Sequence, residues 1–204
     1  MKITHLKRFS GRELRHDFYP LFINLMKKGF EIEAFLLMLS IWNFARFRYV
    51  VRKFKLNQFK KMISGSDSDF RKFQRLNFKT IDFNKYKKEI KRIFRNLSKF
   101  PGVEKTGATK LIHLKVPNVF VMWDGYIRKY YGFKNGDAND YFNFLKLMQE
   151  KFRDLDPKLI DEHNYKTITE PILRKNRKGR ITKKSNPSSR MQSVHYGVKK
   201  LGEC

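Results

Sequence analysis

The stretch LSKFPGVEKTGATKLIHLKVPNVFVMWDGYIRKYYG (residues 97–132) decides how the centre of this chain folds. Its apolar and small residues follow a spacing that predicts two short helices joined by a tight hairpin. The residues on this spacing are Leu97, Phe100, Gly102, Val103, Ala108 and Ile112. Pro101-Gly102 forms the turn, and Ala108 allows the two helices to approach closely. Backbone N–H groups at the turn and at the start of the second helix can then bind a DNA phosphate.

The same stretch resembles the helix–hairpin–helix DNA glycosylase superfamily, in which an L-P-G-V-G-x-K-T-A hairpin precedes a V-D-T-H-V-x-R-V element. The two parts read FPGVEKTGA and MWDGYIRKYYG in this chain. Aligned without a gap from Pro101, the catalytic aspartate of the family falls on Asp124 and its companion arginine on Arg128. The resemblance implies an all-α, two-lobed fold with the hairpin at residues 87–115. The residues that it implies for DNA binding in this part of the chain are Gly102, Val103, Lys110 and Arg128.

A second, shorter similarity lies upstream, in SIWNFARFRYVV (residues 40–51). It resembles the S-x-N-N-I-A-R-I helix of 8-oxoguanine glycosylases, which lines the DNA gap left by a flipped base. The resemblance implies DNA contacts by Asn43 and Arg46, and it favours oxidised guanine as the damaged base. An amphipathic helix that only packs against a core produces similar strings, so both interpretations stay open.

The chain departs from the family pattern at two positions. Glu104 replaces the second hairpin glycine, and a carboxylate there repels phosphate and disfavours the backbone conformations that glycine permits. The catalytic lysine of bifunctional members aligns with Thr106. Lys105, however, precedes Asp124 by the same number of residues as that lysine precedes the aspartate in 8-oxoguanine glycosylases. Lys105 as a nucleophile and a monofunctional enzyme without a lysine are therefore both open alternatives.

Base removal breaks the bond between C1′ and a ring nitrogen through an oxocarbenium-like state. A carboxylate at Asp124 would stabilise that positive charge or activate the incoming nucleophile. The simpler alternative is that Asp124 only caps the helix that begins at Gly125. Lys105 would attack C1′ as a neutral amine and give AP lyase activity, or it is a solvated side chain or a phosphate contact.

A glycosylase must hold the extruded base between aromatic or apolar side chains. The candidates for this base pocket are Trp42, Trp123 and Tyr126, with Phe44 beside them. The alternative for each is a place in the core, because the chain contains 20 Phe.

The net charge is strongly positive and unevenly distributed. Among 204 residues there are 46 Lys and Arg and 19 Asp and Glu, which gives a formal charge of +27. Residues 46–100 carry 18 basic and 4 acidic side chains, a net of +14, and residues 171–204 carry 10 and 1, a net of +9. A small neutral substrate does not need such an excess, whereas a long polyanion attracts it. Nucleic acid is the first candidate, because clustered cations release its counterions.

No cofactor or metal is expected. The single cysteine, Cys204, excludes an intrachain disulfide, a zinc finger and a Cys-ligated iron–sulfur cluster, and the five His show no ligand spacing. The N-terminus lacks the apolar stretch of a signal peptide. The most apolar segment, residues 34–41, is too short to span a bilayer. We therefore expect a soluble intracellular monomer of the cytoplasm or nucleoid, without a membrane partner.

Helical spacing dominates the rest of the chain, and strand-like alternation is nearly absent. We expect helices over residues 30–47 and 85–99, and another from an N-cap at Asp137 to about residue 152. Residues 64–69 (SGSDSD) are expected to form a loop, and residues 116–123 an irregular crossing. The predicted organisation is a helical glycosylase-like domain over residues 1–170 and a flexible basic tail over residues 171–204. Whether this tail contacts phosphates or only solubilises the chain stays open.

Two functions are consistent with these patterns. The first is a base-excision repair glycosylase that acts on damaged double-stranded DNA, with or without AP lyase activity. The alternative is a non-enzymatic helix–hairpin–helix protein that binds DNA or RNA. The hairpin, crossing and Asp124 together favour the enzyme, whereas Glu104 and the displaced Lys105 favour the binding protein.

Overall fold

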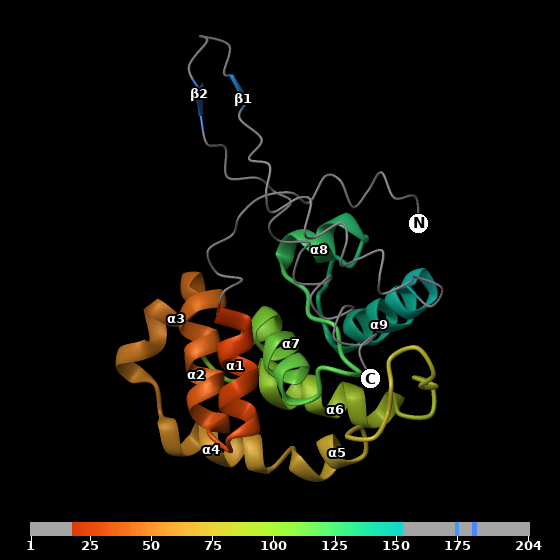
Figure 1. The fold of residues 1–204 in the computed structure, drawn as a ribbon, viewed down its shortest axis with the longest axis horizontal. Coiled ribbons are helices and arrows are strands. Elements are labelled where there is room, and N and C mark those ends of the chain that lie inside the picture. The colour runs from red at the N-terminus through yellow and green to blue at the C-terminus, as the bar shows by residue number, and fades with distance from the viewer. Residues whose placement is uncertain (1–17, 153–173, 176–180, 183–204) are drawn as a thin grey trace.

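Helix α7 (Glu104–Lys115) forms the centre of the fold, and all its residues from Gly107 to Leu114 are buried. Helices α1 (Phe18–Lys27) and α2 (Glu31–Trp42) pack on one side of α7, and α6 (Lys87–Ser98) packs on another (Figure 1). The other elements are α3 (Phe44–Val50), the 3₁₀ turn η3 (Val51–Lys53), α4 (Leu56–Ser64), α5 (Asp67–Arg71), α8 (Gly125–Tyr130), α9 (Ala138–Phe152), β1 (Arg174–Lys175) and β2 (Ile181–Thr182). The prediction of a helical fold is confirmed.

The computed structural model describes residues 18–152, 174–175 and 181–182. The two short strands pair antiparallel, with Arg174 opposite Thr182 and Lys175 opposite Ile181. Apart from these strands, the predicted tail over residues 171–204 lies outside the described residues. No single described helix is long and apolar enough to cross a membrane, although α2 with the segment Phe44–Lys53, bent by 111°, meets that test as a pair.

The predicted pair of helices joined by a tight turn is observed as α6 and α7, with residues 99–103 between them. Helix α6 is amphipathic: Ile90, Ile93, Phe94 and Leu97 are buried, and its other face is rich in Lys and Arg. Helix α7 approaches α2 closely at Gly107. A Cβ atom there would lie 3.0 Å from Asn43 Nδ2 and 3.1 Å from Leu39 Cδ2, so the absence of a side chain permits this packing.

The crossing after α7 is non-helical, as predicted, and its residues 119–123 are fully buried. Side chains satisfy the buried carbonyls of Phe120, Val121 and Trp123 in this crossing. Tyr141 donates its hydroxyl hydrogen to the Val121 carbonyl at 3.0 Å. His113 Nδ1 lies 2.6 Å from the Phe120 carbonyl, and its Nε2 lies 2.6 Å from the Tyr19 hydroxyl. His113 is thus a hydrogen-bonded core residue.

Two sequence predictions about local structure need correction. The single helix expected over residues 30–47 is two helices, α2 and α3, which meet at Asn43 with a bend of 111°. Residues 64–69 are not all loop, since α5 begins at Asp67, where Asp67 and Asp69 place negative charge in its first turn. The predicted start of the last helix is confirmed: Asp137 Oδ1 accepts hydrogen bonds from the N–H groups of Asn139 and Asp140.

Candidate nucleic-acid interface

The turn between α6 and α7 uses two residues with positive φ. Gly102 has φ +85° and Glu104 has φ +50°. A Cβ atom at Gly102 would lie 2.3 Å from Val50 Cγ2. This position therefore favours glycine for two reasons, the positive φ and the lack of space for a Cβ atom. Glu104 adopts the left-handed conformation at the position where the family pattern has glycine. Glu104 thus holds a backbone conformation that glycine adopts freely, with local backbone strain.

The turn itself already uses some of its amide groups. The N–H groups of Val103 and Glu104 both donate to the Phe100 carbonyl, at 3.1 and 3.3 Å. The amide of Val103, predicted to contact DNA, is thus used within the turn, and Gly102 is buried. The next N–H groups, those of Lys105 and Thr106, lie in the first turn of α7, where helix geometry supplies no i−4 partner. They are the better-placed amides for an anion.

Asn43 anchors this turn from the junction of α2 and α3. Its Nδ2 donates to the carbonyls of Gly102 and Val103, at 2.9 and 3.3 Å, and the residue is only 6% exposed. The structure thus brings together the two stretches that the resemblance singled out. In this structure the buried Asn43 amide holds the protein's own turn, and the DNA contact predicted for Asn43 stays a prediction.

Arg46 stands at the surface beside the turn. Its Nε lies 3.6 Å from Glu104 Oε2, and both side chains are at least half exposed. An exposed pair of this kind contributes little to stability. Its effect on the site is electrostatic: the carboxylate of Glu104 offsets the charge that Arg46 would offer to a phosphate.

Asp124 caps helix α8. Its Oδ1 accepts hydrogen bonds from the N–H groups of Tyr126 and Ile127, at 2.8 and 2.9 Å, and its backbone is extended. The capping role, one of the two alternatives for Asp124, is therefore observed. The predicted catalytic role would be carried by this same carboxylate.

Three hydrogen bonds tie the residue before Asp124 to α7. Thr109 Oγ1 donates to the Trp123 carbonyl and accepts from the Trp123 amide, both at 3.2 Å. Trp123 Nε1 donates to the carbonyl of Lys105 at 3.3 Å. Trp123 therefore connects Lys105, at the start of α7, with Asp124, at the start of α8.

The side chain of Lys105 is exposed and reaches the loop between α8 and α9. Its Nζ donates to the carbonyl of Asn135 at 2.7 Å. The amine is thus in contact with solvent and a backbone carbonyl.

Two of the predicted site residues, Lys110 and Trp123, are buried, and a third, Arg128, is half-buried. Lys110, predicted to contact the DNA backbone, is 7% exposed, and its Nζ donates to the Trp42 carbonyl. Trp123 is 0% exposed and packs against core aromatics, so in this structure it offers no face to an extruded base. The guanidinium of Arg128 lies 5.7 Å from the centre of the Trp123 ring, against Gly136.

The other two aromatic candidates differ in exposure. Trp42 is half-buried and stacks on Tyr19, with ring centres 5.8 Å apart. Tyr126 is 57% exposed on the first turn of α8, two residues after Asp124. Phe44, on α3, is also exposed. Tyr126 is therefore the predicted pocket residue that is best placed to meet a base beside Asp124.

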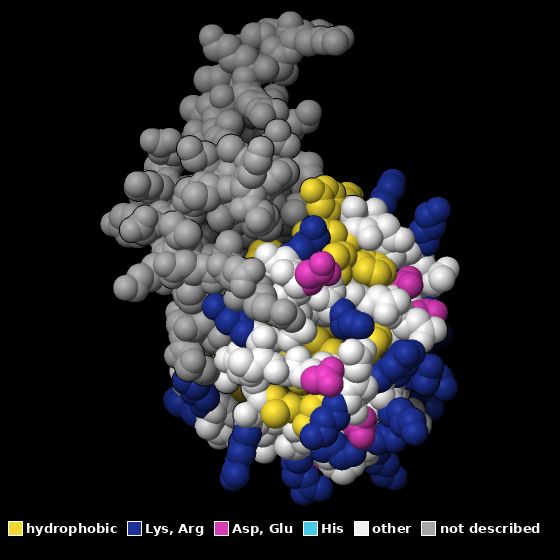
Figure 2. All heavy atoms as spheres, turned by 90° about the vertical axis from the view of Figure 1, so that its right-hand side faces the viewer, with side chains coloured by type: hydrophobic (Ala, Val, Ile, Leu, Met, Phe, Trp, Pro, Cys, Tyr) yellow, Lys and Arg dark blue, Asp and Glu magenta, His cyan; other side chains and the backbone are white. Residues whose placement is uncertain are grey.

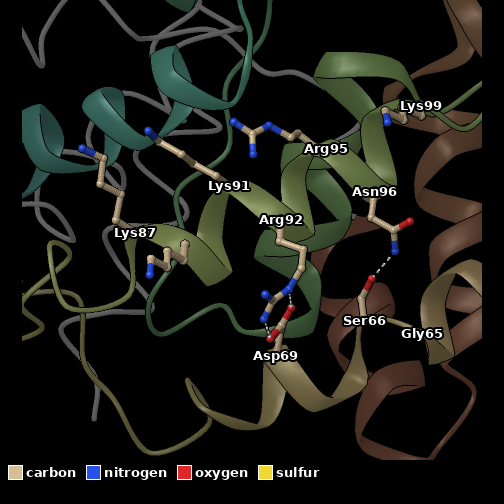
Figure 3. Close-up of a pocket in the computed structure, with 10 residues that line it drawn as sticks. Gly65, Ser66, Asp69, Lys87, Lys91, Arg92, Arg95, Asn96 and Lys99 are labelled. Carbon is tan, nitrogen blue, oxygen red and sulfur yellow. Dashed lines mark hydrogen bonds and ion pairs between the residues drawn. The ribbon is translucent and has the colours of Figure 1, made fainter.

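A groove lies along α6, with a volume of about 870 Å³ (Figure 3). It is lined by Gly65, Ser66, Asp69, Lys87, Lys88, Lys91, Arg92, Arg95, Asn96 and Lys99. Figure 2 shows that Lys and Arg side chains dominate the charged groups on the described part of one face of the molecule. The sequence revealed the basic face of α6 through its periodicity, but the groove depends on the packing of α5 and was not predictable.

Among the described residues, no group of three or more His, Cys, Asp or Glu side chains is placed to hold a metal ion. Comparison of the chain with models of protein families, with curated proteins and with solved structures gave no match.

Proposed function

We propose that this protein is a DNA glycosylase that removes a damaged base from double-stranded DNA, with Asp124 as its catalytic carboxylate. The observation that carries the proposal is the position of Asp124. It follows Trp123, which hydrogen bonds attach to Lys105 and Thr109 of α7, directly after the hairpin turn. A turn suited to a phosphate and a carboxylate suited to the sugar thus belong to one hydrogen-bonded unit. In this proposal the helices form the two-lobed arrangement of the superfamily that the sequence resembles.

The chemistry assigned to Asp124 is electrostatic. Two N–H groups hold its Oδ1 at 2.8 and 2.9 Å and fix the direction of the carboxylate. In the reaction the bond from C1′ to the ring nitrogen breaks, and the base leaves with the bonding electrons and gains a proton. Water adds to C1′ and loses a proton. The negative carboxylate stabilises the positive charge that develops on the sugar between these events.

Binding of DNA is assigned to the hairpin and its neighbours. The N–H groups of Lys105 and Thr106 point from the first turn of α7, where the helix dipole also favours an anion. Arg46 adds an exposed cation next to this turn. Tyr126 supplies an exposed ring close to Asp124 on which the extruded base can stack. The similarity around Asn43 favours oxidised guanine as that base.

AP lyase activity through Lys105 is a separate part of the proposal. The amine is exposed and bound to the Asn135 carbonyl, so it must leave this contact and lose a proton before it attacks C1′. The geometry therefore supports base removal by Asp124 better than strand cleavage by Lys105.

The test is base release from duplexes that carry 8-oxoguanine, uracil or thymine glycol, with borohydride trapping on these duplexes and on one with an abasic site. We expect the wild type to release one of the bases and Asp124→Asn to release none. If a trapped adduct forms with the wild type and disappears in Lys105→Gln, the lyase step is assigned to the Lys105 amine. If base is released but no adduct is trapped, the enzyme is monofunctional. If the wild-type protein binds DNA but releases no base from any duplex, the proposal of an enzyme is contradicted.

The second candidate is a non-enzymatic helix–hairpin–helix protein that binds DNA or RNA. The observation in its favour is that Asp124 already serves as a helix cap and Lys105 as a donor to Asn135, so both have structural contacts. It predicts tight, salt-dependent binding of nucleic acid together with the absence of base release.

A further inference from the structure

The basic face of α6 divides into two strips with different partners. On the strip that faces α5, Arg92 donates to both carboxylate oxygens of Asp69, with its Nε at 2.7 Å from Oδ2. Lys72 lies 2.8 Å from Glu89 Oε1 on the same side. These acids neutralise their cations, and the pairs hold α5 against α6. The fold accounts for these two pairs.

The other strip consists of Lys87, Lys91, Arg95 and Lys99, which follow one another at intervals of four residues. Side chains at this spacing lie on one side of a helix. Figure 3 shows Lys87, Lys91 and Arg95 extending from α6 away from the pair of Asp69 and Arg92. Among the described residues, no carboxylate forms an ion pair with these four cations. We call them the α6 stripe.

Crowding of like charges is visible in the middle of the stripe. Lys91 and Lys87 place their ammonium groups 5.5 and 5.4 Å from the centre of the Phe142 ring on α9. Burial lowers the pKa of Lys91, and the charges of Lys87 and Arg95 lower it further, against a smaller opposing effect of Asp137. Lys87, Lys91 and Arg95 gain from an external anion, because it offsets their mutual repulsion.

The stripe also leads directly to the hairpin turn. Lys99 is the C-cap residue of α6 and begins the connection to Gly102. From Lys87 to Lys99 the helix rises about 18 Å, at about 1.5 Å per residue. One strand of B-DNA presents a phosphate about every 3.4 Å along the axis. A strand that contacts the first turn of α7 can therefore continue along α6 past several phosphates.

We propose that the α6 stripe and its groove bind the phosphate backbone of duplex DNA as an extension of the contact made by the hairpin. This inference rests on DNA being the partner in the proposed function, but it does not depend on base release. Contacts of this kind position the duplex and carry no sequence preference.

The experiment measures binding of an undamaged DNA duplex as a function of salt for the wild type and for Lys91→Gln/Arg95→Gln. Each lost phosphate contact lowers the slope of log K against log salt by about 0.9. We expect the double variant to lose about 2 from this slope and at least about tenfold in affinity at 0.1 M salt. The matched control is Lys27→Gln/Lys28→Gln, which removes two exposed cations at the far end of α1 and should keep the slope within about 1 of the wild-type value.

Folding and partner are tested in the same series. The unfolding temperature of the α6 variant should equal or exceed that of the wild type, since like charges are removed. The charge-conserving variant Lys91→Arg/Arg95→Lys should keep the wild-type salt slope. Equal slopes for the α6 variant and the wild type overturn the inference. The inference is also overturned if the α6 variant loses affinity for an RNA duplex of the same sequence but not for the DNA duplex. If the wild type releases no base but the α6 variant has a smaller salt slope with DNA, the enzyme function is contradicted. The α6 stripe then remains a DNA-binding surface.

Discussion

The side-chain amide of Asn43 donates to the main-chain carbonyl of Gly102 at 2.9 Å, across 59 residues of sequence, and also to Val103 at 3.3 Å. This contact fixes the turn between α6 and α7 against the junction of α2 and α3. Because the amide is buried, no water replaces it at the Gly102 carbonyl, whereas the Val103 carbonyl also accepts the N–H of Gly107 at 2.9 Å. The position of the proposed DNA-binding turn thus depends on a residue that does not itself reach the surface.

Asn43→Ala should destabilise the protein by about 1–3 kcal/mol, because the buried Gly102 carbonyl loses its donor and the Val103 carbonyl keeps only the N–H of Gly107. Denaturant unfolding measures the difference. The control is Asn57→Ala on the exposed surface of α4, for which we expect a change within about 0.5 kcal/mol. Equal stability of the two variants would mean that the bond from Asn43 does not hold the turn.

Gly102→Ala should be more severe than an ordinary glycine substitution. The new methyl group meets Val50 Cγ2 at 2.3 Å, and φ is +85°, so packing and backbone are both strained. We expect a loss of about 2 kcal/mol or more in unfolding free energy. Gly125→Ala is the matched control, since a Cβ atom there meets nothing within 4 Å and φ is not positive. A Gly102→Ala protein as stable as Gly125→Ala contradicts the turn geometry.

Glu104→Gly should increase stability by about 1 kcal/mol, because glycine adopts a positive φ without strain. Loss of the exposed contact to Arg46 offsets little of this gain. Glu104→Gln separates the two effects of the residue. It keeps the strained backbone but removes the charge, so it should raise DNA affinity without raising stability. If Glu104→Gly lowers the unfolding temperature, the side chain contributes contacts that outweigh the strain.

Asp69 gives the unfolding free energy a defined pH dependence. The hydrogen bond from Arg92 lowers the pKa of Asp69, and the charges of Arg92 and Lys72 add to this, although burial opposes it. A carboxyl group with a lowered pKa in the folded state contributes stability above its unfolded pKa and loses that contribution as the pH falls. Asp69→Asn should therefore be about 1–3 kcal/mol less stable than the wild type at pH 7. The gap should close progressively below about pH 4.

Arg92→Gln provides the second arm of this test. In the Asp69→Asn/Arg92→Gln protein the two losses should not add, because either substitution alone removes the same pair. Unfolding curves between pH 7 and about pH 2 would contradict the assignment if the gap between Asp69→Asn and wild type stayed constant throughout.

The hairpin and the two aspartate caps were predictable because their signals are local. Apolar spacing in α6, a Pro-Gly turn, and Asp at the starts of α8 and α9 each act within a few residues along the chain. The break at Asn43 was not predictable in the same way. Its amide is used by a turn 59 residues away, and the sequence of α2 and α3 alone reads as one helix.

The burial of Lys110 and Trp123 was not predictable for a related reason. Lys110 lies on α7, which neighbouring elements cover on several sides, so even its polar positions are buried. A lysine there points its ammonium group to the Trp42 carbonyl and not to solvent. Residue type suggested contact with DNA and with a base, whereas the central place of α7 and of the crossing follows only from the assembled fold.

Asp124→Asn tests the central claim most directly, because asparagine is as good a helix cap as aspartate but carries no charge. The control is Asp137→Asn, which makes the same change at the cap of α9. Base release is followed under single-turnover conditions on the duplex that the wild type processes, with unfolding temperature and DNA affinity measured for each variant. We predict that both variants fold and bind DNA like the wild type, and that only Asp124→Asn loses base release, by about a hundredfold or more. Base release by Asp124→Asn at the wild-type rate would contradict the catalytic assignment.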